Sequence, residues 1–134
     1  MARIVLIDDE HGPVDYYVQA LVDSGHEVAH LDTVDKVFEY LQNPKPADLF
    51  VVDIMMPTLG RPELKDAAEG LATGIVFWHQ IRERFPGVPI IILTSVANPE
   101  ILEGLPFDNK TQIESKIDTL PFELAEVANK LLKS

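Results

Sequence analysis

The chain has 134 residues, a length that one domain can fill, and its 46% hydrophobic and 25% charged residues are ordinary for a globular protein. Its 22 acidic and 11 basic residues give a net charge of −11, which argues against direct binding to nucleic acid or to an anionic membrane, because both require a basic face. There is no cysteine, so disulfides and thiolate zinc sites are excluded. No apolar run approaches the roughly 18 residues of a membrane-spanning helix and the N-terminus is not of the signal-peptide type, so we expect a cytoplasmic protein.

Strand-like and helix-like segments alternate along the chain. Short continuous apolar runs, such as residues 49–52, are typical of strands that are buried on both faces of a parallel sheet. Helices are indicated by apolar residues three or four positions apart and by residues that start helices, such as Pro13 and Thr33. The expected strands, in chain order, cover residues 3–7, 26–30, 49–53, 89–93 and 112–116, and the expected helices cover about 13–23, 34–43, 73–84 and 121–133.

This alternation predicts an α/β fold in which five parallel strands form one doubly wound sheet with helices on both faces. Right-handed crossovers restrict the topology strongly. The five units use the whole chain, so residues 1–134 are expected to form a single domain.

Polar side chains stand where these strands end. Asp8 and Asp9 follow the first strand, Asp53 ends the third, Thr94 follows the fourth and Lys116 ends the fifth. The carboxyl ends of the strands are where open α/β sheets bind their ligands. Carboxylates about 5 Å apart repel by roughly 3 kcal/mol per pair at an effective dielectric constant of 20, so such a cluster needs a compensating cation. A set of oxygen ligands without His or Cys favours Mg²⁺, and Mn²⁺ or Ca²⁺ to a lesser degree. A nearby ammonium and hydroxyl would suit a phosphoryl group during its transfer.

These residues resemble those of the receiver domains of two-component response regulators. The matching segments are residues 4–10 (IVLIDDE), 51–57 (VVDIMMP) and 90–95 (IIILTS), together with Lys116. The resemblance covers essentially the whole chain and implies the flavodoxin-like receiver fold, with strand order 2-1-3-4-5.

The resemblance implies that Asp53 is the phosphoacceptor of a two-component phosphorelay. Asp53 would take a phosphoryl group from a phosphohistidine of a histidine kinase or histidine phosphotransfer protein. Asp9 and Asp53 would bind Mg²⁺ directly, together with the backbone carbonyl of Met55, whereas Asp8 would act mainly through water. Mn²⁺ is a possible substitute for Mg²⁺. Glu10 would have a minor, indirect role.

The other matching residues would hold and sense the phosphoryl group. Thr94 would bond a phosphoryl oxygen, and Lys116 would pair with the phosphoryl charge. Thr94 and Ile113 occupy the switch positions, through which phosphorylation would be passed to an unidentified downstream protein or a homodimer partner. The protein would be a phosphoacceptor that assists its own phosphorylation and slow dephosphorylation, not an enzyme. Met55 and Val96 are both apolar at positions that influence attack by water in this family, which predicts a long-lived phosphate.

The sequence departs from the family pattern near the fifth strand. Ile117 follows Lys116, where the family usually has a proline after a cis bond. A cis bond before a non-proline residue costs ~2.5–4 kcal/mol, so we expect a trans bond here. Ile113 stands where an aromatic residue is expected, and residues 106–109 (PFDN) replace a small Gly-Ala turn.

A third departure is an insertion at about residues 58–71. Gly74, which corresponds to the glycine that opens the third helix in the family, lies 21 residues after Asp53 (74 − 53). That spacing leaves roughly a dozen extra residues beside the acidic residues at the strand ends. Loops of this length in compact domains are often functional. The insertion is either a lid or docking element, or a tolerated surface loop.

Two other functions remain open. One is a receiver-like module that docks proteins without being phosphorylated. The other, a Mg²⁺-dependent phosphohydrolase of a different α/β family, is disfavoured because no second catalytic acid follows Asp53 closely. His11 follows the acidic cluster and is either a loop histidine or a modulator of that cluster.

Overall fold

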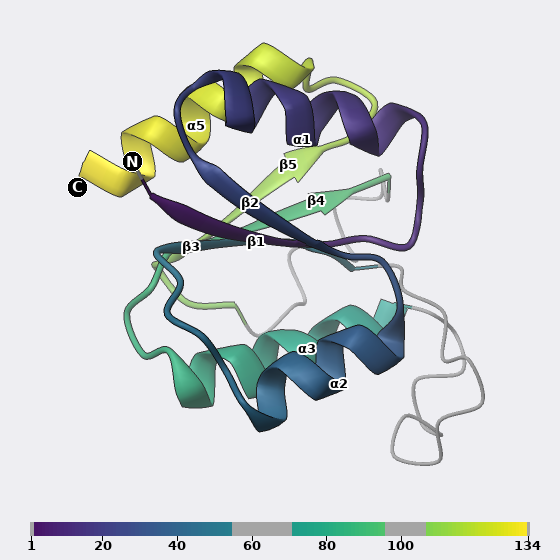
Figure 1. Cartoon of the computed structure of the whole chain (residues 1–134), viewed down its shortest axis with the longest axis vertical. Helices are drawn as coiled ribbons and strands as arrows, with labels where there is room; N and C mark the ends of the chain where they lie inside the picture. The colour runs from purple at the N-terminus through teal and green to yellow at the C-terminus, as the bar shows by residue number, and fades with distance from the viewer. Residues whose placement is uncertain (1, 55–70, 96–106, 134) are drawn as a thin grey trace.

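The computed structural model describes residues 2–54, 71–95 and 107–133, and these contain one sheet of five parallel strands in the order β2-β1-β3-β4-β5 (Figure 1). The predicted fold class and strand order are therefore confirmed. The strands are β1 (Arg3–Ile7), β2 (Glu27–Leu31), β3 (Leu49–Asp53), β4 (Ile90–Thr94) and β5 (Thr111–Ser115), and the helices are α1 (Pro13–Asp23), α2 (Val34–Gln42), α3 (Leu71–Arg84) and α5 (Pro121–Lys133).

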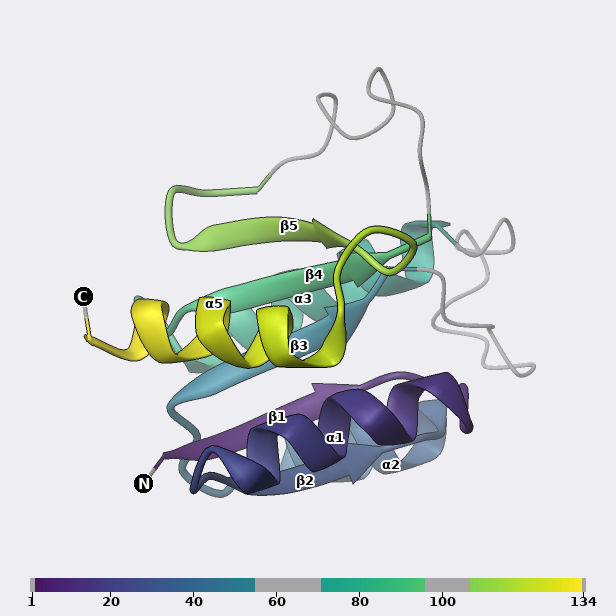
Figure 2. The ribbon, with the colours of Figure 1, turned by 90° about the horizontal axis from the view of Figure 1, so that it is seen from above.

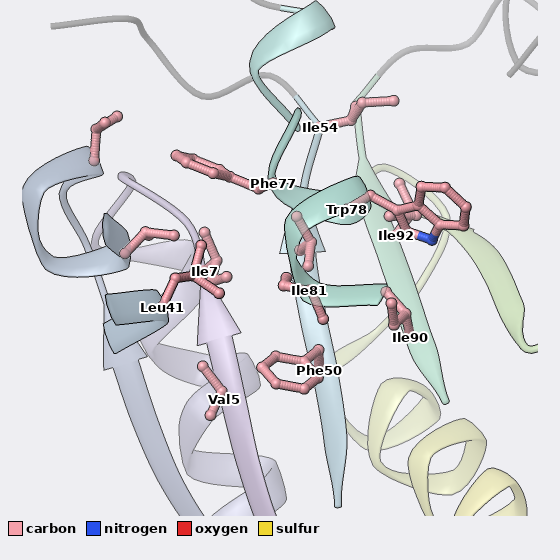
Figure 3. Packing of buried hydrophobic residues seen from close by; sticks show 13 residues of the cluster. Val5, Ile7, Leu41, Phe50, Ile54, Phe77, Trp78, Ile81, Ile90 and Ile92 are labelled. Carbon is pink, nitrogen blue, oxygen red and sulfur yellow. The ribbon is translucent and has the colours of Figure 1, made fainter. Parts of the chain in front are cut away.

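The sheet separates two layers of helices. Helices α1 and α5 cover one face, and α2 and α3 cover the other (Figures 1 and 2). Successive side chains of a strand point to opposite faces. Phe50 therefore belongs to the same hydrophobic cluster as Phe77 and Ile81 of α3 (Figure 3), while Val51 belongs to the cluster under α1 and α5. Every residue of β3 and β4 is buried, as their continuous apolar sequences predict.

Local residues define where the helices begin. Gly12 has a φ of 76°, a left-handed conformation that suits glycine, and Pro13 then occupies the first helical position of α1. The side chain of Thr33 caps α2 by accepting a hydrogen bond from the backbone N–H of Lys36 at 3.1 Å, as predicted.

Three strands differ by one residue from the sequence-based prediction: β2 and β4 lie one residue later than predicted, and β5 lies one residue earlier. Strand β4 extends through Thr94, whose partner across the sheet is Ser115, the last residue of β5. The hydroxyl of Ser115 accepts hydrogen bonds from the backbone N–H groups of Ile117 and Asp118 at 3.1 and 3.3 Å, which starts a turn and ends the strand. Lys116 is therefore the first residue of the loop rather than the last of the strand.

Some predictions concern residues outside the described ranges. The expected insertion at about 58–71 lies there except for Leu71, with which α3 begins, and so do Met55 and Val96. In the part of the chain that is described, no helix combines the length and apolar character needed to cross a membrane.

Candidate functional site

Three polar side chains are buried at the carboxyl ends of neighbouring strands. Asp8 follows β1, Asp53 ends β3 and Thr94 ends β4, and their exposed fractions are 1%, 3% and 1%. These are the buried polar or charged residues of the described chain. Burying a carboxylate is costly unless it is paired, so Asp8 and Asp53 require a cation close by.

Lys116 brings its ammonium into the same pocket. Its Nζ atom lies 2.7 Å from Oδ2 of Asp8, 3.2 Å from Oε1 of Glu10 and 3.4 Å from Oδ2 of Asp53. The side chain of Lys116 is only 12% exposed. Burial by itself would lower the pKa of Lys116, but the close contact with the carboxylate of Asp8 and the charges of Asp53 and Asp8 raise it above its usual value. The lysine is therefore charged.

The pocket has more negative than positive charge. Ligand oxygens of Asp8, Glu10 and Asp53 lie within 4.8 Å of one another, and a single ammonium, that of Lys116, contacts all three groups. Oδ1 of Asp8 accepts the backbone N–H of Glu10 at 3.0 Å. The buried Oδ2 of Asp8 forms an ion pair with Lys116, but Oδ2 accepts no hydrogen bond of ordinary geometry from the described residues. Hard oxygen ligands with excess negative charge fit a divalent ion such as Mg²⁺.

The acidic residues after β1 are arranged differently from their predicted roles. Glu10, expected to act indirectly, lies in the group of converging carboxylates with Asp8 and Asp53, whereas Asp9 is not in that group. Asp9 is partly buried, and its pKa is raised by burial and by the nearby charges of Asp8 and Glu10. Its predicted direct contact with Mg²⁺ stays a prediction.

The Lys116 loop is held in place without a proline. The backbone N–H of Lys116 donates to the carbonyl oxygen of Thr94 at 2.8 Å. The hydroxyl of Tyr17, on α1, donates to the carbonyl oxygens of Thr119 at 2.6 Å and Lys116 at 3.2 Å. No cis peptide bond occurs in the described residues, so the bond to Ile117 is trans as expected, and the ammonium still reaches Asp53. No sequence pattern indicated this role of Tyr17.

Gly74 fixes how closely α3 approaches the end of β3. The backbone N–H of Gly74 donates to the carbonyl oxygen of Ile54 at 3.2 Å. A Cβ atom at position 74 would lie 2.3 Å from Cα and 2.6 Å from the carbonyl oxygen of Ile54, which is too close for any side chain. Glycine is thus required beside the residue that follows Asp53.

Ile113, the predicted switch residue on β5, is partly buried against the cluster that includes Ile92 and Trp78. Phe107, from the segment that replaces the expected Gly-Ala turn, packs on Trp78 with ring centroids 5.2 Å apart. A role of Ile113 in switching stays a prediction.

The fold and the buried polar cluster together are those of a receiver-like α/β domain, and comparisons with known proteins agree. Residues 4–113 match the response regulator receiver domain, and the chain belongs to this family. The chain is 27% identical over 133 residues to the response regulator receiver protein CpdR of Brucella abortus, an alignment that covers 99% of this chain and 96% of the relative.

Solved structures show the same fold. A response regulator receiver protein from Sinorhizobium medicae superposes with a TM-score of 0.77 and 22% identity, covering 99% of this chain and 95% of the other. A CheY-like receiver domain protein from Methanospirillum hungatei gives a TM-score of 0.69 and 20% identity, with coverages of 99% and 94%. Receiver domains act in two-component signalling, so histidine kinases or phosphotransfer proteins are the general class of partner.

Proposed function

We propose that this protein accepts a phosphoryl group on Asp53 from a phosphohistidine of a partner protein, in the presence of Mg²⁺. The observation that carries this proposal is the buried pocket in which the ammonium of Lys116 contacts Asp8, Glu10 and Asp53. An isolated structural ion pair would need one carboxylate, whereas this pocket leaves negative charge for a divalent ion to balance.

In the proposed reaction, a carboxylate oxygen of Asp53 attacks phosphorus. The new oxygen–phosphorus bond makes Asp53 an acyl phosphate. The bond that breaks joins phosphorus to the imidazole nitrogen of the donor. This nitrogen keeps the electron pair and takes a proton from solvent. Lys116 and Thr94 would contact the phosphoryl oxygens and stabilise their charge in the transition state.

The metal would be held by Asp9 and Asp53, with the backbone carbonyl of Met55, and by Asp8 through water. Glu10 lies close enough to take part as well. When bound, Mg²⁺ would supply positive charge to the transferring group. Mn²⁺ offers the same charge and similar oxygen preference.

The proposed protein is a phosphoacceptor and not a turnover enzyme, and we place it in the cytoplasm. The apolar side chains of Met55 and Val96 offer no group that would activate water, so the acyl phosphate should be long-lived. Phosphate loss from the purified protein within seconds at room temperature would contradict this expectation.

The direct test is incubation with Mg²⁺ and acetyl phosphate, followed by intact-mass measurement. We expect an adduct of about 80 Da, one phosphoryl group, that is absent when Mg²⁺ is removed with a chelator and absent in Asp53→Asn. Asp23→Asn, which changes an exposed carboxylate on α1, is the matched control and should be phosphorylated normally. An adduct of the same mass in Asp53→Asn would show that another residue is the acceptor and would refute the assignment.

A second candidate function is protein docking without phosphorylation. It is favoured by three exposed apolar side chains around the start of α5, namely those of Ile117, Leu120 and Phe122, which are 71%, 55% and 58% exposed. Mg²⁺ binding without any phosphoryl adduct, from acetyl phosphate or from a phosphorylated histidine phosphotransfer protein, would favour docking. Turnover of phosphate esters would instead indicate a phosphohydrolase.

A further inference from the structure

A second cluster of metal-ligating side chains lies beside the acidic pocket but shares no side chain with it. His11 follows β1, Asp15 is in the first turn of α1 and His30 is in β2. One nitrogen or oxygen atom of each residue lies within 4.8 Å of the other two. The two imidazole rings are 5.2 Å apart between centroids. Three segments of the chain thus converge on one point of the surface, near the loop from β1 to α1 in Figure 1.

The ring of His30 is oriented with one nitrogen directed away from its hydrogen-bond partner. Its Nε2 atom lies 2.8 Å from the backbone carbonyl oxygen of Asp8. A carbonyl oxygen can only accept, so Nε2 carries the hydrogen. In the neutral ring, Nδ1 then keeps a lone pair that is able to bind a metal ion.

His11 and Asp15 have a similar arrangement. Nε2 of His11 lies 2.9 Å from Oδ2 of Asp32, while its Nδ1 lies 3.6 Å from Oδ1 of Asp15. The other oxygen of Asp15 accepts the backbone N–H of Gly12 at 3.3 Å, which leaves Oδ1 directed at His11. Histidine ligands in metal sites commonly donate their second N–H to a carboxylate or a backbone carbonyl, as Asp32 and the carbonyl of Asp8 would accept here.

We propose that His11, Asp15 and His30 bind a divalent transition-metal ion, with Zn²⁺ as the expected occupant. Two imidazole nitrogens and one carboxylate oxygen suit Zn²⁺ and its neighbours in the first transition row, whereas Mg²⁺ prefers oxygen ligands alone. Nδ1 of each histidine and Oδ1 of Asp15 are the ligand atoms. Three protein ligands leave the fourth tetrahedral position to water.

The side chains need to move only slightly to reach bonding distance. Zn–N and Zn–O bonds of about 2.0–2.2 Å place tetrahedral ligand atoms about 3.3 Å apart. Nδ1 of His11 and Oδ1 of Asp15 are already 3.6 Å apart, and one ligand atom of each of the three residues lies within 4.8 Å of the other two. The side chains of His11 and Asp15 are 59% and 61% exposed, and so they have room to make this change. The alternative without metal is a protonated His11 that only bridges Asp15 and Asp32.

The test is a Zn²⁺ titration of the purified protein, in competition with a chromophoric chelator and with excess Mg²⁺ present. We expect one Zn²⁺ per chain, bound at least about tenfold more weakly by His11→Gln and by His30→Gln. His79→Gln, which changes an exposed histidine on α3, is the matched control and should leave the affinity unchanged within about twofold, the scale of a surface change. Asp53→Asn should also leave it unchanged, because the site does not use the acidic pocket.

Nuclear magnetic resonance supplies a second readout that does not depend on affinity. Zn²⁺ should shift the ring nitrogen signals of His11 and His30, but not those of His79. The exposed variants His11→Gln and Asp15→Asn keep the test valid even if His30→Gln folds poorly. Equal Zn²⁺ affinity in the starting protein, His11→Gln and Asp15→Asn would overturn the proposal, and so would loss of Zn²⁺ binding in Asp53→Asn alone.

Discussion

Replacing Lys116 with methionine should make the stability of the protein depend strongly on Mg²⁺. Methionine keeps most of the length of the lysine side chain but removes the ammonium that contacts Asp8, Glu10 and Asp53. Without Mg²⁺, the variant has three carboxylates close together and no cation between them. We therefore expect a lower free energy of unfolding, which Mg²⁺ restores in part.

The size of the effect follows from the geometry of the pocket. Two carboxylates 4.8 Å apart repel by about 3.5 kcal/mol at an effective dielectric constant of 20. The pair Asp8 and Asp53 contributes most, because Glu10 has an exposed side chain and its charge is screened by water. Relaxation and proton uptake reduce the total, so a loss of about 3–5 kcal/mol, typical of breaking a buried ion pair, is expected.

Urea unfolding of the two proteins, with Mg²⁺ and with a chelator, measures this effect. Mg²⁺ at 100 times its dissociation constant stabilises a protein by about 2.7 kcal/mol, and tighter binding raises this gain. The gain should be larger in Lys116→Met by at least about 1 kcal/mol, because the ion no longer competes with the ammonium. Lys130→Met, which changes an exposed lysine on α5, is the control and should behave as the starting protein. Equal midpoints for Lys116→Met and the starting protein without Mg²⁺ would refute the reasoning.

Three further changes test other parts of the structure. Gly74→Ala should lower the free energy of unfolding by about 2–4 kcal/mol, because its Cβ would stand 2.3 Å from the backbone that follows β3; an unchanged urea midpoint would contradict this packing. Tyr17→Phe removes a hydroxyl that donates to two loop carbonyls, and it should cost about 1 kcal/mol and slow phosphorylation by acetyl phosphate. Burial raises the pKa of Asp108, but hydrogen bonds from Thr111 and Arg82 outweigh it and hold this pKa below its ordinary value of 3.8. The folded state therefore gains stability from Asp108 above pH 3.8 and loses it as the pH falls further, so unfolding curves of Asp108→Asn should lack this acid-dependent part.

The parallel sheet and the residues at the strand ends were predictable because both follow from simple patterns, whereas the strand order was implied by the resemblance to receiver domains. Strands buried on both faces have continuous apolar sequences, and the first polar residue after such a run must lie at the edge of the sheet. That reasoning located Asp8, Asp53 and Thr94, which are the polar residues buried in the described structure. The one-residue shifts at β4 and β5 were not predictable, since the hydroxyl of Ser115 ends β5 through a local turn.

The roles of neighbouring acidic residues after β1 could not be separated by pattern. Asp8, Asp9 and Glu10 are consecutive, and which side chains face the pocket depends on how the backbone turns when it leaves the sheet. In this turn the backbone N–H of Glu10 donates a hydrogen bond to Asp8, and the carboxylate of Glu10 accepts one from Lys116. The pattern of residue types alone does not predict that orientation.

The position of Lys116 shows how contacts far apart in the sequence can replace a local rule. The isoleucine that follows this lysine removes the proline of the family pattern, and the sequence therefore predicted a trans bond at this point. In the structure the loop is held by Tyr17, which is 99 residues away from Lys116 along the chain, and by the sheet bond to Thr94. The ammonium consequently reaches Asp53 through tertiary contacts.

Phosphorylation of Asp53 would add negative charge directly beside an ammonium that Asp8 and Glu10 also attract, so the first response to expect is a redistribution of the contacts of Lys116. Because the exposed Ile117 follows Lys116 directly, that response would begin next to an apolar surface rather than at the partly buried Ile113.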